Sequence, residues 1–467
     1  MRIAPKLLLL VLLILAVAAS LIAQDVLPAD TRASIDKAAN DILAKSGAPS
    51  ASIAVVKDGR IVYEQAYGNA KLDPPVPATP QMRYSIGSIS KQFTATAILL
   101  LAEEGKLSLD DRIVRWLPEL TRSNEVTIRQ ILSMTSGYQD FWPQDYVMPG
   151  MLQSVTAQEI VDQWAKKPLD FEPGAKWQYS NTNYVIAGMI VERVSGTTLL
   201  DFLQKRVFGP LHMTTVSNTD EAPLGPGDPA RYLRYALGPL RPAPKEGKGW
   251  MFAAGELAMT AHDLALWDIS VIDQKVLRPE SYRQMQTEVR LNGGAGARYG
   301  LGVNVGMTDG RRTISHNGEV SGFTAQNTIF PDDRAAVVVL TNLDATNASE
   351  QIGTKIATFV FSTTDSEKEK ALDQARKIFE GLQHGKIDRA LFTSNANAYF
   401  SDLALKDFAS SLGPLGTPKE FTQQTQSLRG GMTLRRYRVQ FEKKTLRAWT
   451  FTMPDGKLEQ YMVAAVE

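Results

Sequence analysis

Three groups of polar residues in this chain have the types and spacing needed to act on a carbonyl compound. In chain order they are Ser88 with Lys91, Tyr179 with Asn181, and His316 with Gly318. A serine hydroxyl can attack a carbonyl carbon when a neighbouring base takes its proton. Lysine and tyrosine can carry that proton, and asparagine and histidine can hold a substrate. The residue types therefore indicate nucleophilic acyl transfer.

The first group opens a predicted helix. Residues three apart on a helix lie on one face, so Lys91 can reach the hydroxyl of Ser88. A lysine becomes a base when burial or a nearby cation lowers its pKa. Gly87 allows close backbone approach at the helix start, where amide groups favour a developing oxyanion. The same spacing recurs at Ser34 and Lys37, which we expect at the surface, so the spacing alone is weak evidence.

The second group, Tyr179-Ser180-Asn181, offers a phenol and an amide. A tyrosine can relay a proton between nucleophile and leaving group when a cation holds it near its phenolate form. Asn181 can hydrogen-bond the lysine or a substrate amide. Tyr67-Gly68-Asn69 has the same spacing, and there we expect Tyr67 to be a packed aromatic at the end of a strand.

The third group, His316-Asn317-Gly318, follows a β-like run at residues 312–315. A strand edge beside a nucleophile can hold a substrate in extended form, and a glycine lets the substrate backbone approach closely. A lone histidine is more often structural. His316 therefore gains its significance only from the two groups that precede it.

The elements that must position these groups follow from the hydrophobic pattern. An amphipathic helix is predicted over 31–47. Two β-rich runs at 51–57 and 61–67 flank Asp58-Gly59, a pair typical of hairpin turns. The helix that follows Ser88 has an almost wholly apolar interior, so it should be buried.

Two later stretches complete the first part of the chain. A second hairpin is predicted from strands at 326–330 and 335–341. Residues 218–249 are rich in proline and glycine, and a long irregular segment is often functional. We interpret this segment as a loop that borders the active site; a surface excursion without a role fits its composition equally well.

The length of 467 residues favours two domains. A basic start, an apolar run and small residues predict a signal peptide over 1–23 and an exported protein, periplasmic or secreted; an uncleaved membrane anchor is the alternative. A first domain is predicted over 24–361 and a polar linker over 362–370. Residues 371–467 are predicted to form a small α+β domain with one helix followed by β-rich runs.

Composition limits the partners. The chain has 51 basic and 50 acidic residues, and its net charge of +1 gives no electrostatic reason to expect nucleic acid or an anionic membrane. It has no cysteine, and no two of its four histidines have the i,i+4 spacing of a helical metal site. We expect no cofactor, no metal, and a small-molecule or peptide substrate; the sequence does not define an oligomeric state.

The order and context of the three groups resemble the serine β-lactamase and penicillin-binding protein superfamily, and its class C-like branch in particular. Residues 84–93 (YSIGSISKQF) look like that branch's nucleophile segment. Residues 131–138 (ILSMTSGY) look like a structural turn in which Met134 stands where histidine is common, a change expected to alter only packing. Further local matches lie at 171–174, 179–181, 299–302 and 321–323. The resemblance covers roughly residues 30–360.

This resemblance implies a mixed α/β (α+β) fold, with an antiparallel sheet flanked by helices beside an all-helical subdomain. The predicted C-terminal domain, a helix followed by an antiparallel meander, resembles an NTF2-like cone. The resemblance also implies an acyl-enzyme whose oxyanion is held by backbone amides. It assigns catalytic roles to Ser88, Lys91 and Tyr179, and substrate contacts to Asn181, His316, Gly318 and the amide of Glu319.

One departure concerns specificity. Class C β-lactamases carry lysine where this chain has His316, and a histidine with an ordinary pKa near 6.5 is mostly neutral at pH 7. We therefore expect esters, D-amino-acid amides or peptides, peptidoglycan-derived ones among them, to be cleaved faster than penicillins. Acidification to about pH 6 should charge the histidine and improve carboxylate substrates.

The main alternative is a sensor or binding protein of the same fold that is acylated without turnover. A hydrolase of the α/β-hydrolase fold is disfavoured, because the sequence has no Gly-x-Ser-x-Gly elbow.

Overall fold

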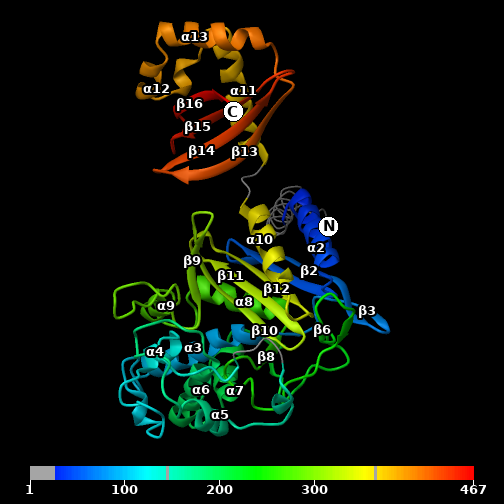
Figure 1. Ribbon diagram of the computed structural model, residues 1–467, viewed down its shortest axis with the longest axis vertical. Coiled ribbons are helices and arrows are strands. Elements are labelled where there is room, and N and C mark those ends of the chain that lie inside the picture. The colour runs from blue at the N-terminus through cyan, green and yellow to red at the C-terminus, as the bar shows by residue number, and fades with distance from the viewer. Residues whose placement is uncertain (1–26, 143–146, 362–364, 467) are drawn as a thin grey trace, which may run out of the picture. The chain divides into compact units, whose positions relative to one another are not determined.

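The computed structural model describes residues 27–142, 147–361 and 365–466. The chain divides into two compact units, Met1–Val360 and Phe361–Glu467 (Figure 1). The predicted signal peptide, 1–23, lies outside the described residues. Within the part of the chain that the structure describes, no helix is long and apolar enough to cross a membrane.

A seven-stranded antiparallel sheet forms the centre of the first unit (Figure 1). In spatial order its strands are β3 Pro75–Pro77, β2 Arg60–Leu72, β1 Ser50–Lys57, β12 Ala335–Thr341, β11 Phe323–Phe330, β10 Arg311–Val320 and β9 Asn304–Thr308. β1, the first strand in the chain, pairs with β12, the strand of this sheet that comes last in the chain. The N-terminal and late segments of the unit are thus joined at its centre.

Both predicted hairpins are confirmed. β1 and β2 are joined at Asp58 and Gly59, whose φ angles of 55° and 74° suit the tight turns that connect twisted strands. β11 and β12 are joined by the single 3-10 turn Pro331–Asp333 and by Arg334, which has a φ of 50°. In both hairpins a residue with positive φ reverses the chain.

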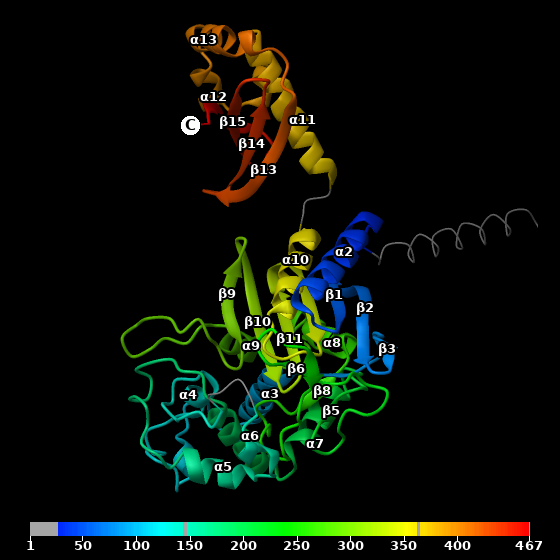
Figure 2. The same ribbon diagram turned by 45° about the vertical axis from the view of Figure 1, so that its right-hand side comes forward.

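The two faces of the sheet are covered by different helices. Successive strand residues point to opposite faces, and Ala54 and Val338 share a buried cluster with residues of α8, Ala261–Ile272. Helices α2, Ala29–Ser46, and α10, Ala348–Phe361, lie on the other side (Figure 2). β12 is buried along its whole length. Its continuous apolar sequence follows from this double coverage.

A group of helices lies beside the sheet, as the resemblance implied. These helices are α3 Ser90–Glu103, α4 Ile128–Leu132, α5 Ala157–Trp164, α6 Asn181–Ser195 and α7 Leu199–Leu203, and α9 Pro279–Met285 contacts α3. The prediction of a buried helix after Ser88 is confirmed, since α3 is buried from Ser90 to Leu101. A 3-10 turn, Gly87–Ile89, precedes α3, so Ser88 lies in the turn that leads into the helix.

The proline- and glycine-rich segment 218–249 is partly regular. Its strands β6 Tyr232–Arg234 and β7 Leu240–Pro242 pair with each other, and a second small sheet joins β4 Tyr84–Ser85, β8 Leu257–Met259 and β5 Ser217–Asn218. Glu246 accepts a hydrogen bond from the amide of Ser321, in the turn after β10 (Oε1···N 2.7 Å). The segment therefore packs beside the strand that carries Gly318.

The second unit has its own sheet and its own core. Its antiparallel meander consists of β13 Glu420–Arg429, β14 Met432–Gln440, β15 Thr445–Thr452 and β16 Leu458–Ala465. Helix α11, Asp365–Gln383, packs against this sheet through Phe379 and Leu382. Because α11 begins at Asp365, most of the predicted linker 362–370 belongs to a helix.

The sequence interpretation also missed two helices of this unit. These are α12, Ser394–Tyr399, and α13, Asp402–Leu412. Each begins after a side chain that caps it: Thr393 accepts from the amide of Ala396, and Ser401 from that of Ala404. Such caps are local signals that a search for hydrophobic periodicity does not detect. The resemblance of this unit to an NTF2-like cone stays a prediction.

We expect the first unit to fold without the second, because each has a separate buried apolar cluster. A chain that ends after Phe361 should be soluble and should unfold in one cooperative transition when it is heated and followed by circular dichroism. The full-length chain is the reference. An insoluble fragment, or one that melts without a cooperative transition, would show that the second unit completes the core of the first.

Candidate active site

Ser88 lies where three segments distant in sequence meet. Strand β4 leads directly into the 3-10 turn that carries it, and β4 is held by pairing with β8. Gly87 has a φ of 51°, and a Cβ at this position would lie 2.7 Å from the amide nitrogen of Glu319. Only glycine suits both its conformation and that contact. Ser88 itself is partly exposed, so a substrate can reach it.

Lys91 is fully buried beside it. Its Nζ donates hydrogen bonds to Ser88 Oγ, Asn181 Oδ1 and the carbonyl oxygen of Ala254, each at 2.8 Å. The three acceptors come from the turn before α3, the start of α6 and the segment before β8. The predicted contact between Ser88 and Lys91 is therefore present, and it includes a backbone carbonyl that the sequence did not indicate.

Burial lowers the pKa of Lys91 from 10.5 to about 7. The low-dielectric surroundings disfavour the ammonium form, and the nearby Asp140 opposes this effect only in part. The unprotonated amine is then accessible near neutral pH, as a general base requires. Lys91 can accept the proton of Ser88 without any further change in its environment.

Tyr179 lies on the open side of the same cluster. Its ring centroid is 5.0 Å from Lys91 Nζ, and its hydroxyl hydrogen-bonds with Ser88. Burial of the hydroxyl raises the pKa of Tyr179 well above its ordinary value, despite the bond with Ser88. The condition of a tyrosine held near its phenolate form is therefore not met here. The neutral phenol is a proton donor, and the base of the pair is Lys91.

Asp140 is a site residue that the sequence interpretation missed. Its carboxylate accepts from the amide of Asn181 (2.9 Å) and from Asn181 Nδ2 (3.3 Å), so it caps the start of α6. Burial raises the pKa of Asp140, and hydrogen bonds from Trp142 and Asn181 oppose the shift. No sequence motif marks this position; only the fold brings the carboxylate beside Asn181 and Lys91.

Met134 also has a role that we did not expect. It has a φ of 62°, and its sulfur accepts from the amide of Ser180 (3.4 Å) and from Asn183 Nδ2 (3.6 Å). The expectation that methionine alters only packing at this position is wrong. The sulfur is a weak acceptor that ties the turn after α4 to the segment carrying Tyr179 and Asn181.

Strand β10 closes the site on the side of the sheet. A Cβ on Gly318 would lie 1.9 Å from the carbonyl oxygen of Ile86 and 3.4 Å from the amide nitrogen of Ser88. The strand can approach the nucleophile turn this closely only because Gly318 has no side chain. The next residue, Glu319, holds the amide of Ala345 through its Oε1 (2.7 Å). The backbone of Glu319 packs against Gly87.

His316 is held in one neutral form. Its Nδ1 lies 2.6 Å from the carbonyl oxygen of Asn317, so this nitrogen carries the proton, and the hydroxyl of Tyr299 donates to Nε2 (3.0 Å). Burial, together with the charge of Lys91, lowers the pKa of His316 to about 3. The expectation that pH 6 would charge this histidine is therefore wrong. A buried imidazole beside an amine that can be protonated stays neutral at that pH.

Four aromatic rings form a wall next to Ser88. The centroid of the Trp177 ring lies 6.5 Å from that of Tyr179 and 5.8 Å from that of Tyr299. The centroid of the His316 ring lies 6.3 Å from that of Tyr179 and 6.0 Å from that of Tyr299. Trp177 is 38% exposed, so part of this residue is accessible to a ligand. At neutral pH this wall carries no formal charge, because the imidazole and both phenols are neutral.

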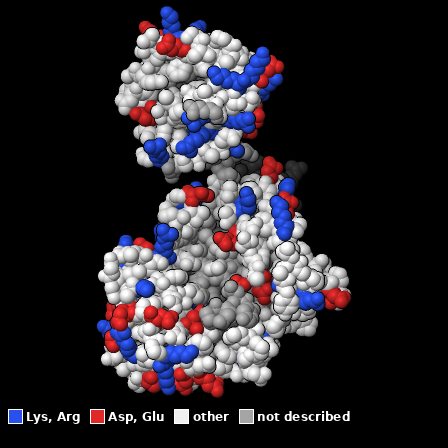
Figure 3. Space-filling model, in the orientation of Figure 1, with Lys and Arg blue, Asp and Glu red and all other residues white. Residues whose placement is uncertain are grey.

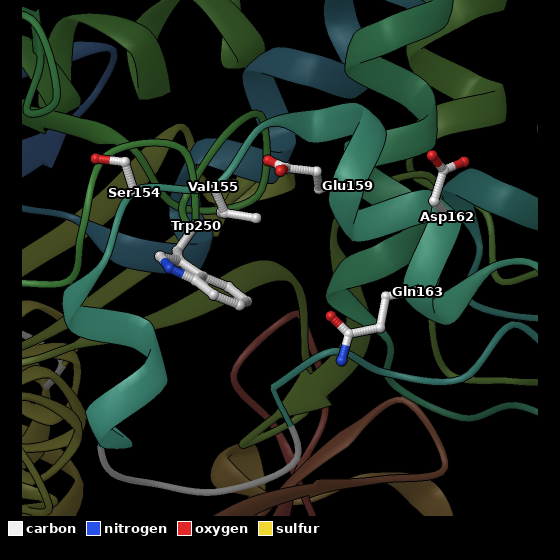
Figure 4. Close-up of a pocket in the computed structure, with 6 residues that line it drawn as sticks. All are labelled: Ser154, Val155, Glu159, Asp162, Gln163 and Trp250. Carbon is white, nitrogen blue, oxygen red and sulfur yellow. The ribbon is translucent and has the colours of Figure 1, made fainter.

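A separate surface hollow of about 480 Å³ lies at the start of α5 (Figure 4). Its lining consists of Ser154, Val155, Glu159, Asp162, Gln163 and Trp250. None of these is a predicted site residue, and Glu159 forms the capping box of α5 with Thr156. Glu159 thus has a local structural role at the start of α5. Among the described residues, no group of three or more His, Asp or Glu side chains could hold a metal ion.

The fold and this cluster define a serine hydrolase of the β-lactamase and penicillin-binding protein superfamily. Residues 35–360 match the Beta-lactamase family, and the chain belongs to it. The matched region contains every predicted site residue and ends where the first unit ends.

Curated relatives include a D-aminopeptidase of Brucella anthropi, which is 28% identical over 334 residues, 68% of this chain and 60% of the relative. The chain therefore spans less than two thirds of that relative's length. Penicillin-binding protein 4* of Bacillus subtilis (strain 168) is 27% identical over 369 residues, 74% of this chain and 78% of the relative.

Solved structures share the fold. An octameric penicillin-binding protein homologue from Pyrococcus abyssi has a TM-score of 0.63 at 22% identity, over 93% of this chain and 96% of that chain. A D-stereospecific amidohydrolase from Streptomyces sp. has a TM-score of 0.61 at 25% identity, over 71% of this chain and 99% of that chain.

The lowered pKa of Lys91 predicts the pH profile. We expect kcat/KM for an uncharged ester to rise with pH and to level off above an apparent pKa of about 7, since the unprotonated amine is the active form. Lys91→Arg keeps a cation that cannot lose its proton, so activity should fall at least about a hundredfold. Lys37→Arg, on the exposed surface of α2, is the matched control. A profile that stays flat from about pH 5.5 to about pH 8.5 would exclude Lys91 as the base.

The histidines provide an internal comparison. His262 lies 3.0 Å from Glu64, which raises its pKa above 6.5, whereas the pKa of His316 is lowered to about 3. In an NMR titration from about pH 8 to about pH 5, the His262 ring signals should shift and those of His316 should not. His316→Gln assigns the silent signal. A His316 midpoint within that range would mean that the imidazole is more hydrated than the structure indicates.

Proposed function

We propose that this protein is an exported enzyme that hydrolyses ester or amide bonds through an acyl-enzyme on Ser88. The observation that carries the proposal is the buried Lys91 amine, 2.8 Å from Ser88 Oγ, with a pKa of about 7. A buried lysine that only stabilised the fold would gain from a carboxylate partner in direct contact. Here its three partners are neutral oxygens, which favours a lysine that exchanges a proton.

In the first half of the reaction, Ser88 Oγ bonds to the substrate carbonyl carbon and its proton passes to Lys91 Nζ. The oxyanion is held by the backbone amides of Ser88 and Glu319. The neutral phenol of Tyr179 then protonates the leaving nitrogen or oxygen as its bond to carbon breaks, and the phenolate recovers a proton from Lys91. Water repeats the sequence on the acyl-enzyme and releases the acid.

The charges around the nucleophile favour a particular substrate class. His316 is neutral, so it does not attract a substrate carboxylate as a lysine would. Asp140 is only partly buried, and its carboxylate can pair with an ammonium group on the substrate. We infer that amides, peptides or esters of amino acids with a free amino group are cleaved faster than penicillins. The relatives named D-aminopeptidase and D-stereospecific amidohydrolase support this inference.

We expect Ser88→Ala to abolish both hydrolysis and covalent labelling by a fluorophosphonate, as followed by intact-protein mass spectrometry. Ser34→Ala removes the other serine that precedes a lysine by three residues. Its hydroxyl only bonds the carbonyl of Asp30 on α2, so both activities should persist. Labelling at another residue would refute the assignment. One equivalent of released product without turnover would identify an acylated sensor instead of an enzyme.

Asp140→Asn tests the substrate class. The amide keeps an acceptor for the amide of Asn181 but removes the charge. We expect kcat/KM for D-phenylalanine amide to fall about tenfold or more, the scale of a lost charge-assisted contact. The value for the N-acetylated amide should change much less. Because an altered Lys91 pKa would affect both substrates alike, equal losses would show that Asp140 acts on Lys91 and not on the substrate.

A further inference from the structure

The sheet of the second unit has one face in the core and one face outside it. Tyr437, Ala448 and Tyr461 lie in the buried cluster with α11. Adjacent residues on the same strands point to the opposite face. The register therefore defines the outer face, where residues such as Trp449 and Phe451 are only partly buried although they are large and apolar.

One part of this face is concave, and the lining of the hollow combines outer-face residues with the core-facing Tyr461 and with residues of α12. A cavity of about 740 Å³ lies where α12 meets the strands. Its lining consists of Asn395, Ala396, Tyr399, Phe400, Arg429, Gly430, Met432, Trp449, Phe451, Glu459, Gln460, Tyr461 and Met462. Aromatic rings and flexible thioethers line one part of the wall, an environment that accommodates apolar groups of varied shape, and polar side chains that include Arg429, Glu459 and Gln460 line the rest. Its volume is within the range of sites for small organic ligands.

The adjacent part of the same face is basic. Arg438 lies directly opposite Arg447 across β14 and β15, and Arg436 lies opposite Trp449. Like charges directly opposite each other destabilise a sheet. Among the described residues, no carboxylate lies within ion-pair distance of Arg436, Arg438 or Arg447. The same holds for Arg429, which lines the cavity. The ion pairs found in this unit are Lys377 with Asp373 and Lys419 with Glu442.

The apolar and basic parts are continuous. Arg447 Cζ lies 5.8 Å from the centroid of the Trp449 ring, and Arg429 Cζ lies 5.8 Å from that of Phe451. Figure 3 shows Lys and Arg side chains over the strands of this unit. A ligand that fills the cavity therefore has the guanidinium groups of Arg429 and Arg447 near its edge. The carboxylate of Glu459, which accepts hydrogen bonds from Thr393 Oγ1 (2.6 Å) and Asn395 Nδ2 (3.0 Å), also lines the cavity. The net charge of +1 for the whole chain conceals this local excess.

We propose that this face of the second unit binds a small anionic amphiphile, a molecule with an apolar body and a carboxylate or phosphate group. The body occupies the cavity against Trp449, Phe451 and Met462. The anion pairs with Arg436 and Arg447, which relieves the repulsion between Arg438 and Arg447. The concave shape favours a discrete molecule, because a flat bilayer surface cannot fill a hollow between a helix and a sheet.

The test is isothermal titration of the full-length protein with monomeric dodecanoate and dodecyl phosphate, with dodecanol as the uncharged probe. We expect both anions to bind at one site and dodecanol to bind at least about tenfold more weakly. Arg436→Gln combined with Arg447→Gln should weaken anion binding about tenfold or more. Trp449→Ala should weaken binding of all three probes. Arg376→Gln, an exposed arginine on α11, is the matched control.

Each variant is accompanied by its thermal unfolding curve, so that loss of binding is separated from loss of fold. The Ser88→Ala protein should bind the probes as the wild type does, which separates this site from the proposed active site. Three outcomes would overturn the proposal: no binding of either anion, binding that the arginine and tryptophan variants leave unchanged, or binding to phosphatidylglycerol vesicles without binding to the monomeric anions.

Discussion

The amine of Lys91 is held out of water by the packing of α3 against α6, and this burial governs the chemistry of the site. Removing an ammonium group from water costs free energy that three neutral acceptors do not fully return, so the pKa falls to about 7. A fully paired lysine would keep its proton and could not activate Ser88. The site therefore depends on a buried amine whose three hydrogen-bond acceptors are all neutral oxygens.

The fold supplies the acceptors from distant parts of the chain. Strand β4 and its turn present Ser88, the start of α6 presents Asn181, and the segment before β8 presents the carbonyl of Ala254. Strand β10 approaches from the opposite side. The backbones lie so close together there that a side chain at Gly87 or at Gly318 would clash with backbone atoms. The large sheet and the helical group act as two rigid supports, and the reacting atoms lie at the junction between them.

The two units differ in the charges that surround their candidate sites. In the first unit, a neutral His316 and a partly exposed Asp140 make the surroundings of the nucleophile unfavourable for a substrate carboxylate. In the second unit, arginines on the outer face of the sheet lack acidic partners among the described residues. The family match ends at residue 360, the last residue of the first unit. The second unit carries a surface of its own.

The sequence alone determined the elements whose signals are local. The apolar helix after Ser88, both hairpins and the three polar groups follow from residue spacing and turn chemistry, and the structure contains them. Properties that depend on contacts between distant segments could not be predicted from residue spacing and turn chemistry. The pKa of Lys91, the neutrality of His316 and the position of Asp140 result from which groups the fold removes from water and places side by side. Local propensity describes the backbone; the electrostatics of a buried group depend on every segment packed around it.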